Sequence, residues 1–248
     1  MSQKNNLIVV WYLGGVLVGG NVFLHWLLNH LSWGDDMEYL VRLFCLLGIF
    51  IWLNYRYLHL KPCLGTSVGV LEQVRVNSSS WLLICISILP VMFQIWPADM
   101  MFLMKTILLT MFGVFVEEYL CRGLLLGYAL KESVSYKQLI IRIFQVSILF
   151  GFAHIGNIFE QSFIFTLYQV FYTIVYGIYF SALTLRTKGL FWSMFLHFFI
   201  NLNSAFLLQG NVTTGVPSLL GILIVNSVLL LCSLYLLRKK KVSEWLIN

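Results

Sequence analysis

Long apolar stretches separated by short polar segments dominate the chain. An α-helix needs about 20 apolar residues to cross a bilayer core roughly 30 Å thick, and the apolar stretches have that length. The pattern predicts eight membrane-spanning helices, at about 7–28, 39–58, 81–97, 101–130, 138–156, 163–183, 189–208 and 217–237. The first stretch is too long for a cleaved signal peptide, so we expect it to remain as an anchor.

Charged residues alternate in sign from one connection to the next. If the N-terminus lies in the cytoplasm, the inner segments contain Lys4, Arg56, Lys61, Arg75, Lys131, Lys137, Arg186, Lys188 and the basic run 238–241. The outer connections contain Asp35, Asp36, Glu38, Asp99 and Glu160. Positive residues are retained on the cytoplasmic side of a membrane. The sequence therefore predicts an all-α, polytopic bundle of about eight transmembrane helices with both termini in the cytoplasm.

The composition excludes several classes of protein. The 248 residues are 60% hydrophobic and 10% charged, which a soluble domain does not tolerate on its exterior. The net charge of +6 follows from the basic inner loops, so we expect the lipid bilayer, and no nucleic acid, as a partner. The five cysteines form no C-x-x-C pair and indicate neither a disulfide framework nor a metal site.

Three ionisable residues lie within the fourth predicted span: Glu117, Glu118 and Arg122. Each costs at least ~2.5–3.5 kcal/mol at bilayer depth, so such residues face a protein interior or a wet cavity. The spacing of four places Glu118 and Arg122 on one helix face, where they can form an ion pair. Glu117 is turned about 100° from Glu118, and the sequence does not decide which carboxylate faces a cavity.

Further polar residues lie in the fifth and seventh spans. His154 is near the end of the fifth, and His197 and Asn201 share one face of the seventh. At about 1.5 Å per residue, these side chains and Glu117 lie roughly 12–24 Å from the inner ends of their spans, which allows one cluster. We expect such a site to be reached laterally or from the cytoplasm. His25, by contrast, lies at a span end and is expected at the membrane interface.

Three motifs, in this order on three hydrophobic segments, resemble those of the CPBP intramembrane protease family, also called Abi or CAAX-protease-like. They are Glu117-Glu118-x-x-x-Arg122, Phe150-x-x-x-His154 and His197-x-x-x-Asn201. The family includes enzymes that clip prenylated CaaX proteins and bacterial members tied to bacteriocin processing and self-immunity. The resemblance implies a catalytic core at 101–208, between a three-span segment at 1–100 and a last span with a basic tail at 209–248.

The resemblance also implies a role for each motif residue. Glu117 is expected to act as general base, with His154 holding the same water. His197 and Asn201 would donate to the oxyanion, and Arg122 would pair with Glu118. Glu118 could exchange roles with Glu117.

The predicted site could either bind a zinc ion or work without a metal. Glu117, His154 and His197 could supply the three protein ligands of a catalytic zinc ion. The chain has no His-Glu-x-x-His, however, and the amide of Asn201 is a poor zinc ligand. The resemblance favours a metal-free site, so we expect no cofactor.

The sequence thus predicts an intramembrane endopeptidase, multi-pass in a bacterial cytoplasmic membrane, that uses a glutamate-activated water. Its substrate would be a bacteriocin or signalling peptide, another membrane protein, or a CaaX-like protein. One alternative is a non-catalytic immunity or regulatory protein of the same fold. Another is a proton-coupled transporter, which would show helices broken by Gly or Pro in paired spans; the four prolines here lie away from the motifs. The sequence leaves the oligomeric state open.

Overall fold

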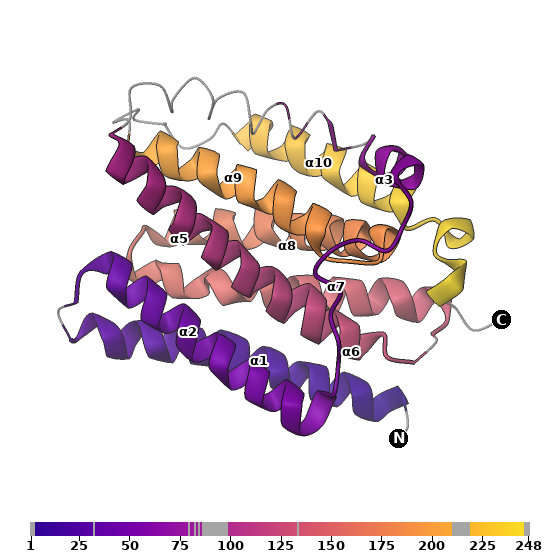
Figure 1. Cartoon of the computed structure of the whole chain (residues 1–248), viewed down its shortest axis with the longest axis horizontal. Helices are drawn as coiled ribbons and strands as arrows, with labels where there is room; N and C mark the ends of the chain where they lie inside the picture. The colour runs from indigo at the N-terminus through magenta and orange to yellow at the C-terminus, as the bar shows by residue number, and fades with distance from the viewer. Residues whose placement is uncertain are drawn as a thin grey trace.

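The computed structural model describes residues 3–31, 33–78, 80, 81, 83, 85, 99–132, 134–209 and 219–245. These residues form helices that run side by side in one bundle (Figure 1). The described part contains no β-strand, which confirms the predicted all-α fold.

The helices correspond to seven of the eight predicted spans. In chain order the long ones are α1 (Gln3–Asn29), α2 (Asp35–Leu53) with η1 (Asn54–Leu58), α5 (Met100–Glu118) with η2 (Tyr119–Leu126) and α6 (Gly127–Ala129), α7 (Tyr136–Phe152) with η3 (Ala153–Phe159), α8 (Phe163–Thr187), α9 (Phe191–Gln209) and α10 (Leu219–Leu236). The short ones are α3 (Val70–Asn77), η4 (Lys239–Lys241) and η5 (Ser243–Trp245). The predicted third span, 81–97, lies largely outside the described residues.

Four helical segments of the described part are long and apolar enough to cross a membrane. They are Asn6–Asn29, Met100–Ala129, Tyr136–Phe159 and Phe163–Thr187, and a shorter apolar helix covers Leu223–Leu236. Large apolar side chains on the outside of the bundle, such as Trp52, Met101 and Leu231, are more than half exposed. An exterior of this kind suits lipid contact, as in an integral membrane protein.

α8 lies at the centre of the bundle. It packs against α7 on one side and α10 on the other, and it also contacts α9, η2 and η3. α1 joins the bundle through α7 and η3, α2 packs on α1, and α5 lies across α9 (Figure 1). The side chains of Tyr179, Phe180 and Leu183 on α8 are completely buried. This core fixes the position of the helices that contain the three motifs.

The two ends of the bundle differ in charge, as the loops predict. One end is formed by residues 59–69, 130–132, 134–137, 187–190 and 238–245, and we call it the basic end. There the backbone N–H of Leu190 donates to the carbonyl of Cys63 at 2.9 Å. The opposite end, formed by residues 29–31, 33–38, 99–100 and 159–163, is called the acidic end. α1 begins and α10 finishes at the basic end (Figure 1).

The contact between α7 and α8 depends on small residues. A Cβ atom added at Gly177 would lie 3.0 Å from the Cβ of Ser147. Small residues let two membrane helices approach closely, and such contacts replace the hydrophobic driving force available in water. We therefore expect Gly177→Val to lower the free energy of unfolding by about 1–3 kcal/mol through overpacking.

Thermal unfolding in detergent measures this loss. Gly15 offers a matched control, because a Cβ added there meets nothing within 4 Å. Equal melting temperatures for Gly177→Val and Gly15→Val would show that a larger side chain at Gly177 does not destabilise the contact between α7 and α8.

Candidate active site

Glu118, the last residue of α5, belongs to a buried polar cluster. Its side chain is fully buried, and Oε1 accepts a hydrogen bond from Arg122 Nη1 at 3.0 Å. The same oxygen lies 2.9 Å from Nδ1 of His197. The predicted i,i+4 pair is therefore formed, and it also holds the histidine of α9. Because breaking a buried ion pair leaves an uncompensated charge, these three groups depend on one another.

Two aromatic rings enclose the Arg122 side chain. The guanidinium carbon lies 4.1 Å from the ring centre of Phe150 and 5.3 Å from that of Phe180. A cation over a ring face is attracted by the quadrupole of the ring, more strongly where water is excluded. Arg122 also lies in η2, a π-helical segment whose backbone hydrogen bonds join residues five apart. Such π-helical turns occur frequently at functional sites.

His197 lies between the two carboxylates. With Nδ1 facing the Glu118 carboxylate, the other ring nitrogen, Nε2, lies 3.6 Å from Glu117 Oε2. Asn201 Nδ2 is 3.1 Å from the same Nε2, as expected for residues on one helix face. The imidazole stacks on Phe180, with ring centres 5.0 Å apart. A carboxylate on one nitrogen fixes the ring orientation and leaves Nε2 for chemistry.

Glu117 faces a cavity, whereas Glu118 does not. Its side chain is 28% exposed, compared with 0% for Glu118. The cavity has a volume of about 810 Å³, and its walls include Glu117, His154, His197 and Asn201. Two adjacent residues thus occupy opposite environments, because each step along a helix turns the side chain by about 100°.

His154 lines the same cavity from η3, at the end of α7. Its Nδ1 lies 2.9 Å from the carbonyl oxygen of Phe150. Because a carbonyl only accepts, Nδ1 donates this bond, and Nε2 of the neutral ring is an acceptor. The structure therefore brings residues of all three motifs to one cavity. His154 takes no part in the hydrogen bond between Glu118 and His197.

The cavity extends from these residues to the acidic end. Its walls there include Asn29, Asp35, Asp36 and Glu160. All four are exposed, so the cavity reaches the surface at that end. We expected access laterally or from the cytoplasm, whereas under the predicted topology the acidic end faces outward. The physical reason is the placement of α1 and α2, whose outer halves form walls of the cavity.

A second polar cluster in this cavity was missed by sequence reasoning. His25 lies near the end of α1, as expected, but its side chain is only 2% exposed and is held inside the protein. Its Nδ1 lies 2.7 Å from Glu38 Oε1, 2.7 Å from Arg42 Nη1 and 3.5 Å from Glu160 Oε1. A signal existed, since His25 and Glu38 are each about one turn from the short connection between α1 and α2, which places them opposite each other.

The two histidine clusters differ in how closely their possible metal ligands approach one another. The ligand atoms of His25, Glu38 and Glu160 lie within 4.8 Å of one another, but the Arg42 guanidinium occupies the same Nδ1 and would repel a cation. Among the described residues no such grouping includes the alternative zinc ligands Glu117, His154 and His197. The metal-free site stays a prediction.

One known protein family matches the segment that contains the three motifs. Residues 99–203 match the family model described as type II CAAX prenyl endopeptidase Rce1-like. This segment is Rce1-like, consistent with the CPBP family. The predicted family is thus confirmed, and it is a family of proteases. No curated protein and no solved structure matches the chain. The Rce1-like segment contains every predicted site residue, from Glu117 to Asn201.

Proposed function

We propose that the protein is an intramembrane endopeptidase that hydrolyses a peptide bond with a water activated by Glu117. The observation that carries the proposal is the contrast between two neighbouring carboxylates. Glu117 faces the cavity, and Glu118 is buried against Arg122 and His197. A carboxylate at the cavity wall can reach a water there and take a proton from it, as a general base must.

Glu117 and His154 would act together on the water. Glu117 takes a proton as the water oxygen attacks the peptide carbonyl, and it later delivers this proton to the leaving amine. Nε2 of His154 is an acceptor because the carbonyl of Phe150 fixes the hydrogen on Nδ1. A water in the cavity can donate to both groups, which directs its lone pair toward the substrate.

His197 and Asn201 would stabilise the oxyanion. Nδ1–H of His197 donates to Glu118, and Nε2 accepts from Asn201 Nδ2, so both side chains are held at the cavity wall, where the Asn201 amide would turn its N–H to the oxyanion. Preorganised donors aimed at the developing negative charge supply a large share of the catalysis in acyl transfer. Arg122 balances the charge of Glu118, so the second carboxylate holds His197 without repelling the oxyanion strongly.

The function is tested by purified protein in lipid nanodiscs with a panel of membrane-anchored peptides. The panel holds a bacteriocin precursor, a signalling-peptide precursor and a farnesylated CaaX peptide. We expect cleavage of at least one member, and the same rate after dialysis against a zinc chelator, because Glu117 and His154 hold the water without metal. Cleavage lost to the chelator and restored by zinc would indicate a metal-activated water instead. A protein that cleaves nothing would support the non-catalytic alternative.

The direction of access gives a separate prediction. Asn29 lies on the cavity wall at the acidic end. In a variant whose native cysteines are replaced by serine, we expect Asn29→Cys to react with a membrane-impermeant thiol reagent from outside intact cells. A bulky adduct there should also slow cleavage, because it narrows the path to Glu117. Lys61→Cys, at the basic end, is the control and should react only after the cells are opened. The reverse labelling pattern would place the cavity mouth in the cytoplasm.

A further inference from the structure

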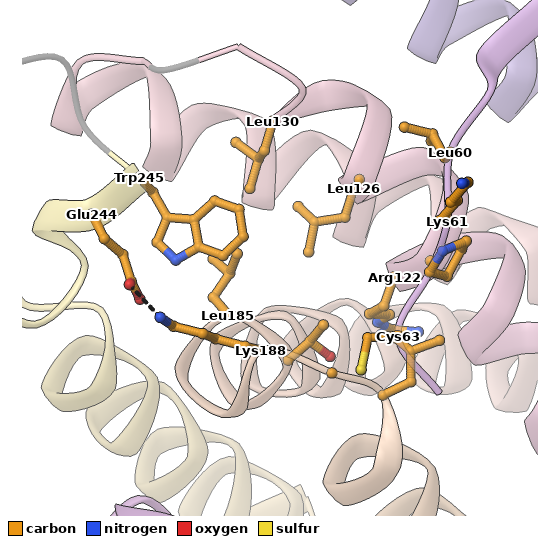
Figure 2. A pocket seen from close by; sticks show the side chains of 16 residues that line it. Leu60, Lys61, Cys63, Arg122, Leu126, Leu130, Leu185, Lys188, Glu244 and Trp245 are labelled. Atoms are coloured by element: carbon orange, nitrogen blue, oxygen red, sulfur yellow. Dashed lines mark ion pairs between the residues drawn. The ribbon is translucent and has the colours of Figure 1, made fainter. Parts of the chain in front are cut away.

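The protein has two cavities, and Glu117 lies on the wall of the one that opens at the acidic end. The other cavity, of about 410 Å³, lies at the basic end, and Figure 2 shows its walls with the ion pair between Lys188 and Glu244. Among the described residues, the walls at the basic end include Arg122 but not Glu117. The polar groups that a substrate meets on its way to Glu117 are therefore those of the cavity at the acidic end.

Tyr39 of α2 places its hydroxyl on the α5 wall of this cavity. Tyr39 and Glu117 are both wall residues. A Cβ atom added at Gly113 would overlap the Tyr39 hydroxyl, so this oxygen lies directly against the α5 backbone. Gly113 precedes Glu117 by four residues and lies on the same helix face. The absence of a side chain at Gly113 thus makes room for the hydroxyl one turn from the proposed base.

The position of the Tyr39 ring is fixed by its neighbours. The guanidinium carbon of Arg42 lies 5.8 Å from the ring centre. Near Tyr39, the rings of Phe44 and Phe112 join α2 to α5, with their centres 4.6 Å apart. A group that packing already holds in place loses little freedom when it binds a ligand. The hydroxyl is therefore preorganised on the cavity wall.

The Tyr39 hydroxyl is available as a donor. Tyr39 is partly exposed, and its hydroxyl forms no hydrogen bond with another described residue. Nor is this oxygen one of the polar atoms of the described part that are buried without a partner. The charged side chains that act electrostatically on the hydroxyl are Glu117 and Arg42, which also line the cavity. The O–H can thus donate a hydrogen bond inside the catalytic cavity.

The spacing along α5 indicates which part of a substrate the hydroxyl meets. α5 begins at the acidic end, so Gly113 lies about 6 Å nearer to the cavity mouth than Glu117. An extended peptide advances about 3.3 Å per residue. The hydroxyl is therefore about one or two residues from the bond being cleaved, on the outer side. A peptide removed from bulk water needs donors for its main-chain carbonyls, and the O–H is such a donor.

We propose that Tyr39 is a substrate-binding residue, which donates a hydrogen bond to a main-chain carbonyl of the extended substrate just outward of the cleaved bond. This contact would hold the peptide in register, with the carbonyl to be attacked in reach of the water at Glu117. Recognition of the main chain does not depend on the substrate's side chains, so every cleaved peptide should use the contact. Tyr39 lies outside the matched segment 99–203, and the inference rests on the proposed peptidase function.

Tyr39→Phe tests this role, because it removes the hydroxyl and keeps the ring. With a peptide that the wild-type protein cleaves, we expect kcat/KM to fall about tenfold, since one polar group of the bound substrate loses its hydrogen bond. The melting temperature should stay near the wild-type value, because the hydroxyl bonds to no described residue. Tyr12→Phe is the control and should leave kcat/KM unchanged, because Tyr12 is 74% exposed and lies outside the cavity walls.

Peptide analogues locate the contact on the substrate. An (E)-alkene in place of one peptide bond keeps the extended shape and removes the carbonyl, and the nearest bonds on either side of the cleaved bond are replaced in turn. For the wild-type protein, one of these analogues should lose about as much kcat/KM as Tyr39→Phe does with the normal peptide. With that analogue, Tyr39→Phe should cause no further loss, because two changes that remove one contact are not additive.

Gly113→Ala disturbs the same contact from the other side. The added methyl would displace the hydroxyl, so kcat/KM should again fall. In the Tyr39→Phe background the nearest remaining ring atom, Cζ, lies 3.1 Å from the added Cβ, so a small shift makes room. We therefore expect Gly113→Ala to cause little further loss in that background.

Failure of this inference is distinct from failure of the proposed function. A wild-type protein that cleaves no peptide would overturn both. Wild-type cleavage together with an unchanged kcat/KM in Tyr39→Phe would overturn the inference alone. A loss in Tyr39→Phe that persists in full with every alkene analogue would also overturn it, because Tyr39 would then act on something other than the substrate main chain.

Discussion

Replacing Glu117 with Gln should lower the rate of peptide cleavage by at least about 10²-fold, the loss expected when a general base is removed. The change keeps the shape of the side chain and removes its ability to take a proton. Because Glu117 is partly exposed in the cavity, the folded state should lose little stability. Cleavage of a responsive peptide by purified protein, together with thermal unfolding, measures both quantities.

Two matched substitutions make this result specific. Glu132→Gln removes a carboxylate outside the cavity walls and should leave the rate unchanged. Glu118→Gln should lower both activity and stability, because it breaks the contacts with Arg122 and His197. Our assignment of the base would be wrong if Glu117→Gln cleaved at the wild-type rate while Glu118→Gln folded normally and was inactive.

Removing the Arg122 side chain should produce the largest loss of stability in the site. Arg122→Ala leaves Glu118 buried without its cationic partner, at a cost of about 3–5 kcal/mol in the free energy of unfolding. It also removes the packing between Phe150 and Phe180. Activity should fall as well, since His197 depends on a charged and fixed Glu118. Unfolding by heat in detergent and the cleavage assay are the two measurements.

Arg122→Lys separates charge from geometry. A lysine restores one positive charge but lacks the planar fork and the stacking surface of a guanidinium, so we expect partial rescue of stability. Arg75→Ala is the control, because Arg75 is exposed on α3. Wild-type stability in both Arg122 variants would mean that the pair with Glu118 is not formed in the membrane.

Much of this arrangement follows from local sequence pattern. Apolar length and loop charge are properties of short segments, so they predicted the described spans and the separation of charge between the two ends. Helical spacing predicted that Glu118 faces Arg122 and that His197 and Asn201 share a face, and both contacts are present. These features need no knowledge of how distant helices pack.

The features that sequence could not supply depend on that packing. Whether Glu117 or Glu118 faces the cavity is decided by the rotation of α5 against α9, which no spacing along one helix reveals. The path to the acidic end is set by α1 and α2, which lie outside the three motifs. The cavity at the basic end is likewise formed by residues distant in sequence, among them Pro62, Arg122 and Trp245.

The opening at the acidic end determines which compartment the proposed chemistry belongs to. Under the predicted topology, the water that Glu117 consumes and the proton that it exchanges come from outside the cell. The part of the substrate on the outer side of the cleaved bond would then be released directly to the exterior.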